Sequence, residues 1–377
     1  MEKFDVAIIG AGPAGSAAAI GLAQRGYAVV LIDKKYFPRE KICGDFVNPI
    51  NWPVFRELGV EDRVLAQPHA EVTGFRITTA AGDAAAAQFT SPGQERVTGL
   101  GIRRARLDQV LLDQAVQFGV TVRQGKRIEN LSRPAHNWLI DCGEESWRAK
   151  ILIGADGRNS WVAQRLGMNK RPIVQGRSVG FQIRLKCAAS AGNVEIHLFP
   201  GGYAGIIELG DGTINLGLAI DKQKLPRERS AEFLFSEALP RNRHLKDLIQ
   251  RSERASKLRS VYPVHFPQRC CYADALLLVG DAARVSEPVT GEGIYFAMRS
   301  GLMAAETADQ ALRHDDLSAA RLRRYREDCQ RAFRGRLALN SLFRFAMYRP
   351  ALLDPLIRFS SKNDRMLNSL VGAVCAL

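Results

Sequence analysis

The sequence FDVAIIGAGPAGSAAAIGLAQRGYAVVLID, residues 4–33, decides the fold. Residues 4–9 form a short apolar run of the kind found in a strand buried in a parallel sheet. A helix rich in small residues is expected over 16–25, and a second apolar strand over 27–32. The stretch therefore predicts a Rossmann-like unit of strand, helix and strand at the start of the chain.

The glycine motif between the first strand and the helix points to a dinucleotide. Gly10 allows a tight turn, Gly12 lets the backbone approach a pyrophosphate, and Gly15 lets helix and strand pack closely. Asp33 follows 18 residues after Gly15, where a carboxylate can accept hydrogen bonds from ribose hydroxyls. A glycine triplet alone also fits an ordinary turn, but the whole ordered unit favours dinucleotide binding. It does not separate NAD from FAD.

Two later segments favour FAD. Residues 151–160 read as a strand that runs into the turn Asp156-Gly157, and residues 275–283 as a strand that ends in Gly280-Asp281. Residues 288–294, PVTGEGI, then open another helix. An aspartate at a strand's carboxyl end can bond a polyol chain, and a glycine-rich helix start can lie against a flat ring. Asp-Gly turns are common, so only the set in this order is informative.

Composition places the chain among ordinary soluble proteins. Its 377 residues are enough for two or three domains, with 46% hydrophobic and 24% charged residues. The seven cysteines have no regular spacing and the six histidines stand far apart, which argues against a disulfide framework and a metal cluster. A reducing cytoplasm is the expected compartment. Lys and Arg (53) exceed Asp and Glu (39) by 14, so the surface should attract anions.

The remaining chain suggests a second sheet. Residues 76–99 and 176–268 alternate between apolar and polar residues, which is typical of antiparallel strands. The expected fold is α/β, with a Rossmann-like FAD-binding domain, an inserted antiparallel-sheet substrate domain and a C-terminal helical segment. The sheet would cover the flavin and enclose an apolar pocket. The expected divisions are an FAD domain of 1–75, 100–175 and 269–317, a substrate domain of 76–99 and 176–268, and a helical segment of 318–377.

Three residues on the expected strands are candidates for acid–base chemistry, namely Glu195, His197 and Glu208. An outward polar position is the simpler interpretation of each, because alternate strand residues face solvent.

With these motifs in place, the chain resembles the flavoprotein group of p-hydroxybenzoate hydroxylase-type enzymes, flavin-dependent halogenases and geranylgeranyl reductases. The matching stretches are the glycine motif, residues 104–108, Asp156-Gly157 and Gly280-Asp281. Within the group it is most similar to the geranylgeranyl reductase family. FPREKICGD at 37–45 looks like that family's basic-Cys-Gly segment, and PVTGEGIYFAMRSG at 288–301 looks like its flavin-ring segment.

The resemblance implies a role for each matched position. The glycine motif with Ala14 would meet the FAD pyrophosphate, Asp33 the ribose, Arg104 the phosphates or ribityl chain, Ile128 the adenine, and Asp281 the ribityl chain. The flavin ring would lie against Cys43, Gly44, Gly293 and Ile294. The expected cofactor-binding residues are Gly10, Gly12, Ala14, Gly15, Asp33, Arg39, Cys43, Gly44, Arg104, Ile128, Asp156, Gly280, Asp281, Pro288, Gly291, Gly293 and Ile294.

Cys43 is the only residue to which the resemblance lends a catalytic role. The simpler interpretation is a small buried hydrophobe, because no partner that would activate the thiol is visible in the sequence.

One departure from the family bears on the substrate. Geranylgeranyl reductases carry an aromatic-x-Trp-x-Phe-Pro stretch in the sheet, whereas residues 202–208 read GYAGIIE, without Trp or Pro. The Trp-x-Trp pair of the halogenases is also missing. The isoprenoid nature of the substrate is therefore left open, and halogenation is disfavoured.

The C-terminal segment is strongly basic. Residues 321–365 hold 12 basic residues against four acidic ones. This pattern fits either a packed helix with solvated arginines or a basic amphipathic patch on anionic lipid. The lipid interpretation assigns contact to Arg331, Arg334, Arg336, Arg344 and Arg349 with Phe333, Leu337, Phe343, Phe345 and Met347. Pro350 and Pro355 are expected to break the helix afterwards.

The principal hypothesis is an FAD-dependent oxidoreductase that reduces a carbon–carbon double bond of an apolar substrate, with FAD bound non-covalently. The alternative is a flavin monooxygenase acting on an aromatic or polyketide-like substrate. A flavin-binding electron carrier, or a basic nucleic-acid-binding protein, is a third class; nucleic acid is not the expected partner. Only one glycine motif is present, so NADPH or NADH would dock transiently, or a small redox protein would deliver electrons. The expected location is cytoplasmic, with peripheral contact at the inner face of the membrane. The oligomeric state is left open.

Overall fold

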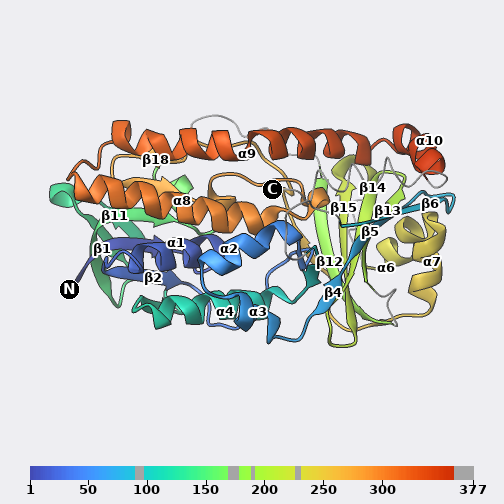
Figure 1. The fold of residues 1–377 in the computed structure, drawn as a ribbon, viewed down its shortest axis with the longest axis horizontal. Coiled ribbons are helices and arrows are strands. Elements are labelled where there is room, and N and C mark those ends of the chain that lie inside the picture. Colours follow the sequence, from blue (N-terminus) through green and yellow to red (C-terminus); the bar gives the residue numbers. More distant parts are fainter. Residues whose placement is uncertain (90–96, 169–177, 188–191, 226–230, 361–377) are drawn as a thin grey trace.

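A computed structural model describes residues 1–89, 97–168, 178–187, 192–225 and 231–360 of the 377 (Figure 1). One end of the elongated molecule is a mostly parallel sheet with its helices, and the other end is a mostly antiparallel sheet (Figure 1). The two sheets meet where the chain segments of the predicted flavin site converge. The predicted α/β fold class is confirmed.

The first sheet is the Rossmann-like one, with strand order β18-β19-β11-β1-β2-β8. Its central strands are buried along their apolar runs, which explains the continuous hydrophobic stretches in the sequence. The strands are β1 (Glu2–Ile9), β2 (Val29–Asp33), β8 (Thr121–Gln124), β11 (Ser146–Gly154), β18 (Tyr272–Ala273) and β19 (Leu276–Leu278), with β9 (Asn130–Ser132) and β10 (Trp138–Asp141) attached to β11. The helices of this half are α1 (Pro13–Ala23), α2 (Trp52–Glu57), α3 (Glu61–Leu65), α4 (Arg104–Gln117), α5 (Trp161–Arg165) and α8 (Gly293–Arg313).

The second sheet has strand order β16-β12-β15-β14-β13-β5-β6, with β17 also paired to β12. Neighbouring strands are antiparallel except β5 and β13, which pair in parallel because β5 arrives from the earlier part of the chain. The strands are β5 (Gly74–Thr78), β6 (Ala84–Gln88), β12 (Ser178–Lys186), β13 (Asn193–Phe199), β14 (Gly202–Glu208), β15 (Thr213–Asp221), β16 (Glu253–Arg254) and β17 (Arg259–Val261). A domain boundary at residue 76 falls within β5, and part of 76–99 and 176–268 lies outside the described residues.

The second sheet is apolar on both faces. One face packs Phe181, Ile183, Leu216 and Leu218 against the segment with α6 (Ala231–Phe233) and α7 (Arg243–Gln250). The other face turns toward the first sheet. A small sheet of β3 (Phe46–Val47), β4 (Ala70–Val72) and β7 (Gly99–Gly101) lies beside it. The face directed at the first sheet forms a wall of the candidate site.

Helix α9 (Ala319–Met347) runs along both halves of the molecule, and α10 (Pro350–Ser360) lies at the far end of the second sheet (Figure 1). The 29 residues of α9 give this helix a length of about 44 Å. Helix α9 ends before Pro350, as predicted, and Pro350 opens α10. Pro355 does not break a helix, because it lies inside α10. Proline is accepted at a first helical position, where its missing N–H has no partner to lose. Residues 361–377 of the predicted helical segment lie outside the described chain.

Most of the apolar side chains of α9 that were predicted to contact lipid face the interior of the protein. Phe333 and Met347 are buried, and Leu337 and Phe343 pack against buried clusters, so they contact the protein. Phe345 is 53% exposed. No helix in the described ranges is both long and apolar enough to cross a bilayer.

Candidate functional site

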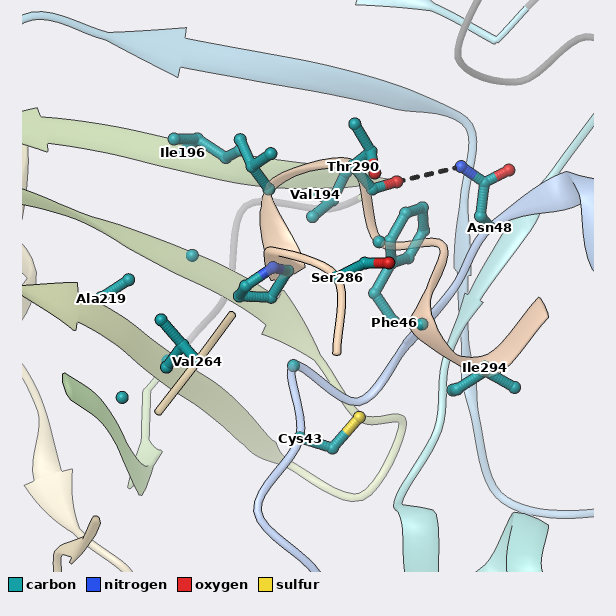
Figure 2. Close-up of a pocket in the computed structure, with 18 of the residues that line it drawn as sticks. Cys43, Phe46, Asn48, Val194, Ile196, Ala219, Val264, Ser286, Thr290 and Ile294 are labelled. Atoms are coloured by element: carbon teal, nitrogen blue, oxygen red, sulfur yellow. Dashed lines mark hydrogen bonds between the residues drawn. The ribbon is translucent and has the colours of Figure 1, made fainter. Parts of the chain in front are cut away.

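A cavity of about 310 Å³ lies between the two sheets and reaches from the start of α1 to α10. Figure 2 shows its lining, with Cys43, Ser286 and Ile294 on one side and Ile196 and Ala219 of the second sheet on the other. Its walls are mostly apolar. Ten predicted cofactor-binding residues line it: Gly12, Ala14, Cys43, Gly44, Arg104, Asp281, Pro288, Gly291, Gly293 and Ile294.

The turn before α1 forms one end of the cavity. Gly10 has φ +107°, and a Cβ there would collide with the Ala155 carbonyl, so the tight turn requires glycine. Gly12 caps α1 without any side-chain hydrogen bond, and Gly12, Pro13 and Ala14 face the cavity. The first amides of α1 therefore have the arrangement that binds phosphate.

Asp33 braces this turn. Its Oδ2 accepts a hydrogen bond from the Ala11 amide at 2.9 Å, and its Oδ1 accepts one from the Lys35 amide at 2.9 Å. Arg39 Nη2 lies 3.5 Å from Asp33 Oδ2, and Arg39 Nη1 lies 3.2 Å from Asp108 Oδ2. Asp33 and Arg39 thus hold the turn before α1 in place. We call this turn, with the first amides of α1, the cradle.

Cations gather at the same end. Lys41, Arg104 and Arg158 line the cavity together with Asp281. Arg104 pairs with Asp108 through two bonds of 2.8 and 2.9 Å, and although burial opposes its charge, Asp108 raises the pKa of the guanidinium. Burial lowers the pKa of Lys41, partly offset by Asp281. Arg158 lies 3.6 Å from Asp281, so a positive balance faces the cavity.

The segment before α8 forms the opposite rim. Gly291 has φ +66° and lies against the ring of Phe46, while a Cβ at Gly293 would meet open space. Asn48 donates from Nδ2 to the Thr290 carbonyl at 3.3 Å, the bond drawn in Figure 2. Helix α8 also begins without a side-chain cap, and Gly293 and Ile294 in its first turn line the cavity.

Cys43 is half-buried at the cavity wall (Figure 2). Its carbonyl oxygen accepts hydrogen bonds from Gln182 Nε2 at 2.9 Å and from Asn215 Nδ2 at 3.0 Å. Two strands of the second sheet therefore fix the backbone of the predicted basic-Cys-Gly segment. After Asp108, Cys43 is the next group that raises the pKa of Arg104, the cation at the phosphate end.

The acid–base candidates from the sequence lie elsewhere. Glu195 and His197 are buried rather than outward, which corrects the expectation, and their side chains lie 3.0 Å apart. They alternate with Val194 and Ile196, which line the cavity, so they occupy the opposite face of β13. Glu208 is half-buried and is absent from the lining.

A buried glutamate with two tyrosine partners adjoins the cavity, and sequence reasoning missed it. The carboxyl of Glu287 is buried and accepts hydrogen bonds from the hydroxyls of Tyr203 at 3.0 Å and Tyr348 at 2.8 Å. Burial raises the pKa of Glu287, and the two hydroxyls lower it in part. Tyr203 lines the cavity. The available signal was Glu287 directly before the flavin-ring segment, but its partners come from β14 and the end of α9.

Other predicted residues support the lining from behind. Gly15 packs against Gly10, and Gly280 packs against Ala14. The half-buried Asp156 accepts from the Val162 amide at 3.1 Å, and its other oxygen, which is buried, has no hydrogen-bond partner among the described residues. Ile128 belongs to the core of the first sheet. The predicted residues that are absent from the lining are Gly10, Gly15, Asp33, Arg39, Ile128, Asp156 and Gly280.

These features fit FAD. The glycine-rich start of α1, with three cations beside it, suits a pyrophosphate, because helix N-termini and guanidinium groups stabilise anions. The spaces at Gly44 and Gly293, where a Cβ would touch nothing, leave room for a flat ring. Asp281 lines the same cavity, and its neighbour Gly280 packs against Ala14 of α1 and Ala297 of α8.

The comparisons with known proteins agree with this geometry. The model of the FAD binding domain family matches residues 3–337. A digeranylgeranylglycerophospholipid reductase of Methanosarcina mazei is 30% identical over 341 residues, which cover 85% of this chain and 79% of that protein.

Solved structures share the fold. A geranylgeranyl bacteriochlorophyll reductase-like protein from Thermoplasma acidophilum has a TM-score of 0.82 at 22% identity, covering 99% of this chain and 96% of that one. The flavin-dependent brominase Bmp2 has a TM-score of 0.81 at 22% identity, covering 99% and 94%. At this identity the two likenesses establish the architecture alone.

Proposed function

The chain belongs to the FAD binding domain family and, within it, to the geranylgeranyl reductase family, and we propose that this FAD-dependent oxidoreductase reduces a carbon–carbon double bond of an apolar substrate. The observation that carries the proposal is the cavity, which joins a phosphate-binding cradle to a long apolar chamber. The name of the Methanosarcina protein says that it is a reductase of a digeranylgeranylglycerophospholipid, and this supports an apolar substrate.

Three of the polar side chains along the apolar part of the cavity are already engaged in hydrogen bonds. The hydroxyl of Tyr203 donates to Glu287, the hydroxyl of Thr290 donates to Glu292 at 2.7 Å, and the amide of Asn48 donates to a carbonyl. A polar substrate would have to compete with these bonds. The body of the substrate in this chamber should therefore carry few hydrogen-bonding groups.

Each part of the chain has a defined task in this proposal. FAD, once reduced, supplies the hydride. The cradle at α1, with Arg104 and Asp281, holds the cofactor, and the second sheet excludes water from the chamber. Side chains that carry a proton at the chamber wall include the thiol of Cys43 and the hydroxyl of Tyr203, which is already donated to Glu287, so the thiol of Cys43 is the group proposed to protonate the second carbon.

The pattern of FAD contacts predicted from the sequence is retained as part of this proposal. Direct contact is proposed for the ten lining residues, and support of the cradle for Gly10, Gly15, Asp33, Arg39, Asp156 and Gly280. Ile128 would lie beside the adenine. The cofactor is proposed to be non-covalent, so heating the purified yellow protein should release intact FAD. Colourless protein that also fails to bind added FAD would remove the basis of the proposal.

The electron donor is proposed to be NADPH or NADH docking transiently, or a small redox protein. Stopped-flow mixing of the FAD-loaded protein with each nucleotide under anaerobic conditions tests this. Rapid bleaching of the flavin by either one identifies a nucleotide donor. No bleaching by either one, in protein that dithionite reduces, identifies a protein donor.

A monooxygenase acting on an aromatic or polyketide-like substrate is the second candidate, favoured by the aromatic rings of Phe46, Phe75, Phe89 and Phe343 at the cavity. Photoreduction without oxygen, followed by air, separates the two. Prompt reoxidation without an oxygen adduct supports the reductase, whereas a long-lived adduct and substrate-dependent oxygen uptake support the monooxygenase.

A further inference from the structure

One wall of the chamber, formed by β14 and β15 and called the floor below, has few side chains at its centre. This open space bears on the shape of the substrate. Alternate residues of a strand point to the same face of a sheet, so Tyr203 and Gly205 of β14 share one face with Gly217 and Ala219 of β15, and all four line the cavity. Gly205 pairs with Gly217 across the two strands, and Tyr203 pairs with Ala219. The centre of the sheet is therefore nearly free of side chains where it faces the cavity.

The space above the two glycines is open. A Cβ on Gly205 would meet no atom within 4 Å, and one on Gly217 would meet only the Gly205 carbonyl oxygen at 3.9 Å. Gly180 on β12 also faces the cavity, but a Cβ there would press on Val264 at 2.7 Å, so that glycine is required for packing. Packing does not explain Gly205 and Gly217, and both line the cavity.

The gap lies beside the expected position of the flavin ring. Gly217 pairs with Gln182 on β12, and Gln182 donates to the Cys43 carbonyl. Asn215, two residues before Gly217, donates to the same carbonyl. The side-chain-free floor thus borders the Cys43-Gly44 segment, and Figure 2 shows Cys43 across the cavity from Ala219.

The dimensions of the floor favour a ring over a chain. Paired residues on neighbouring strands stand about 5 Å apart, and alternate residues along a strand stand about 7 Å apart. A six-membered ring with its methyl groups covers such an area, whereas a single extended chain would leave the side of Gly217 empty and lose its dispersion contacts. Ile196 beside Gly205 and Tyr203 along the same strand form walls around the floor.

We propose that Gly205 and Gly217 admit a flat, ring-bearing apolar group against the flavin, so that the substrate presents a ring rather than a slender chain at its reacting end. The inference rests on the proposed function only in placing FAD at the cradle, and it holds for reduction and for hydroxylation alike. It gives a physical reason for the missing Trp of the stretch 202–208, because an indole at the floor would occupy the space of the ring.

Two isomeric probes test the proposal on the full-length, FAD-loaded protein. β-Ionone carries a substituted cyclohexene ring, and pseudoionone is its open-chain isomer with the same atoms. Binding is followed by the change in flavin absorbance and by the shift in melting temperature. We expect β-ionone to bind about tenfold more tightly, a difference of about 1.4 kcal/mol. Equal affinities, or tighter binding of pseudoionone, would contradict the inference.

The variant Gly205→Leu fills the floor and should remove the preference for β-ionone while leaving pseudoionone binding within about twofold. Gly335→Leu is the matched control, because Gly335 lies in α9 with open space around it and is absent from the cavity lining. FAD affinity, titrated in each variant, should not change. Loss of FAD from Gly205→Leu would mean that the floor holds the cofactor instead and would overturn the inference.

The remaining outcomes separate this inference from the proposed function. FAD binding without a response to either probe would overturn the ring inference and leave the flavoenzyme in place. Failure of the wild-type protein to bind FAD would instead overturn the proposed function itself.

Discussion

Asp33 and Asp281 were predicted to play similar roles, but their surroundings differ. Both oxygens of Asp33 are occupied by backbone amides of the turn, whereas Asp281 lines the cavity, 3.6 Å from Arg158 and without a hydrogen bond from the described residues. The sequence could place both aspartates at strand ends, because the glycine motif and the Gly-Asp pair mark those ends. Which oxygens remain available depends on loop geometry, and this the sequence did not predict.

Replacing Asp281 with Ala should weaken FAD binding by about 1–3 kcal/mol, the usual effect of losing one buried polar partner. The measurement is a fluorescence titration of apoprotein with FAD. Asp62→Ala, an exposed position on α3, is the control and should bind as the wild type does. An unchanged affinity in Asp281→Ala would remove Asp281 from the cofactor contacts.

Asp45 introduces a dependence on pH. It is fully buried, accepts from the Arg104 amide at 3.1 Å and from Gln182 at 3.1 Å, and burial raises its pKa from 3.8 to about 6 despite Arg184 nearby. A carboxyl with a raised pKa in the folded state takes up its proton more readily there than in the unfolded chain. Its stabilising contribution is complete below about pH 4 and is lost as the pH rises through 6.

The variant Asp45→Asn should remove this dependence. Between pH 4 and pH 7.5 the wild type should lose about 2–2.5 kcal/mol of unfolding free energy relative to the variant, most of the effect of a shift of about two pKa units. Urea unfolding of both proteins at both pH values measures the difference. The contributions of all other titratable groups are the same in the two proteins and cancel in the comparison. Parallel pH profiles for the two proteins would show that Asp45 titrates normally.

At the scale of elements, periodicity identified the strands and helices but could not assign their faces. The alternating residues of β13 are apolar on the cavity side, yet its polar residues Glu195 and His197 are also buried, because a second apolar layer covers the back of the sheet. Helix α9 has a similar ambiguity. Its polar and apolar residues are mixed, and only the packing shows that Phe333 and Met347 face inward.

The ion pair between Arg336 of α9 and Glu292 at the start of α8 links these helices at the cavity rim. The Nη1–Oε1 distance is 2.7 Å, and Glu292 is 2% exposed. Arg336→Met should lower the free energy of unfolding by about 3–5 kcal/mol, because it leaves a buried carboxylate without its cation. Arg334→Met, on the exposed side of the same helix, should change it by less than about 0.5 kcal/mol. Equal unfolding curves for the two variants would contradict a structural role for the pair.

At the scale of the whole molecule, the cavity and the exposed apolar surface meet at α10. Leu356 lines the cavity and is 40% exposed, and Ile357 and Leu353 line it from the same helix. The outer side of this end exposes Leu342, Phe345, Leu352 and Phe359, and Arg349 stacks on Phe345 at 3.8 Å. Sequence reasoning found the mixture of arginines and apolar residues, but only the structure shows which of them remain outside.

These exposed residues define a revised membrane prediction. We expect weak, salt-sensitive association with anionic bilayers through Arg331, Arg334 and Arg349 and the exposed apolar side chains, which would bring the cavity mouth to a lipid surface. Each basic residue near an anionic surface contributes about 1 kcal/mol, and screening over about 8 Å at physiological salt keeps the contact reversible.

Liposome flotation with and without anionic lipid measures this association. Phe345→Ser with Phe359→Ser should reduce recovery with anionic vesicles, and so should replacement of the three arginines by Gln. The control Phe118→Ser changes an exposed ring beyond the end of α4 and should float as the wild type does. Because charge attraction and apolar insertion are both required, recovery should fall when either is removed and when salt is raised. Equal recovery with neutral vesicles, or none with either kind, would leave the arginines as a solvated face of α9.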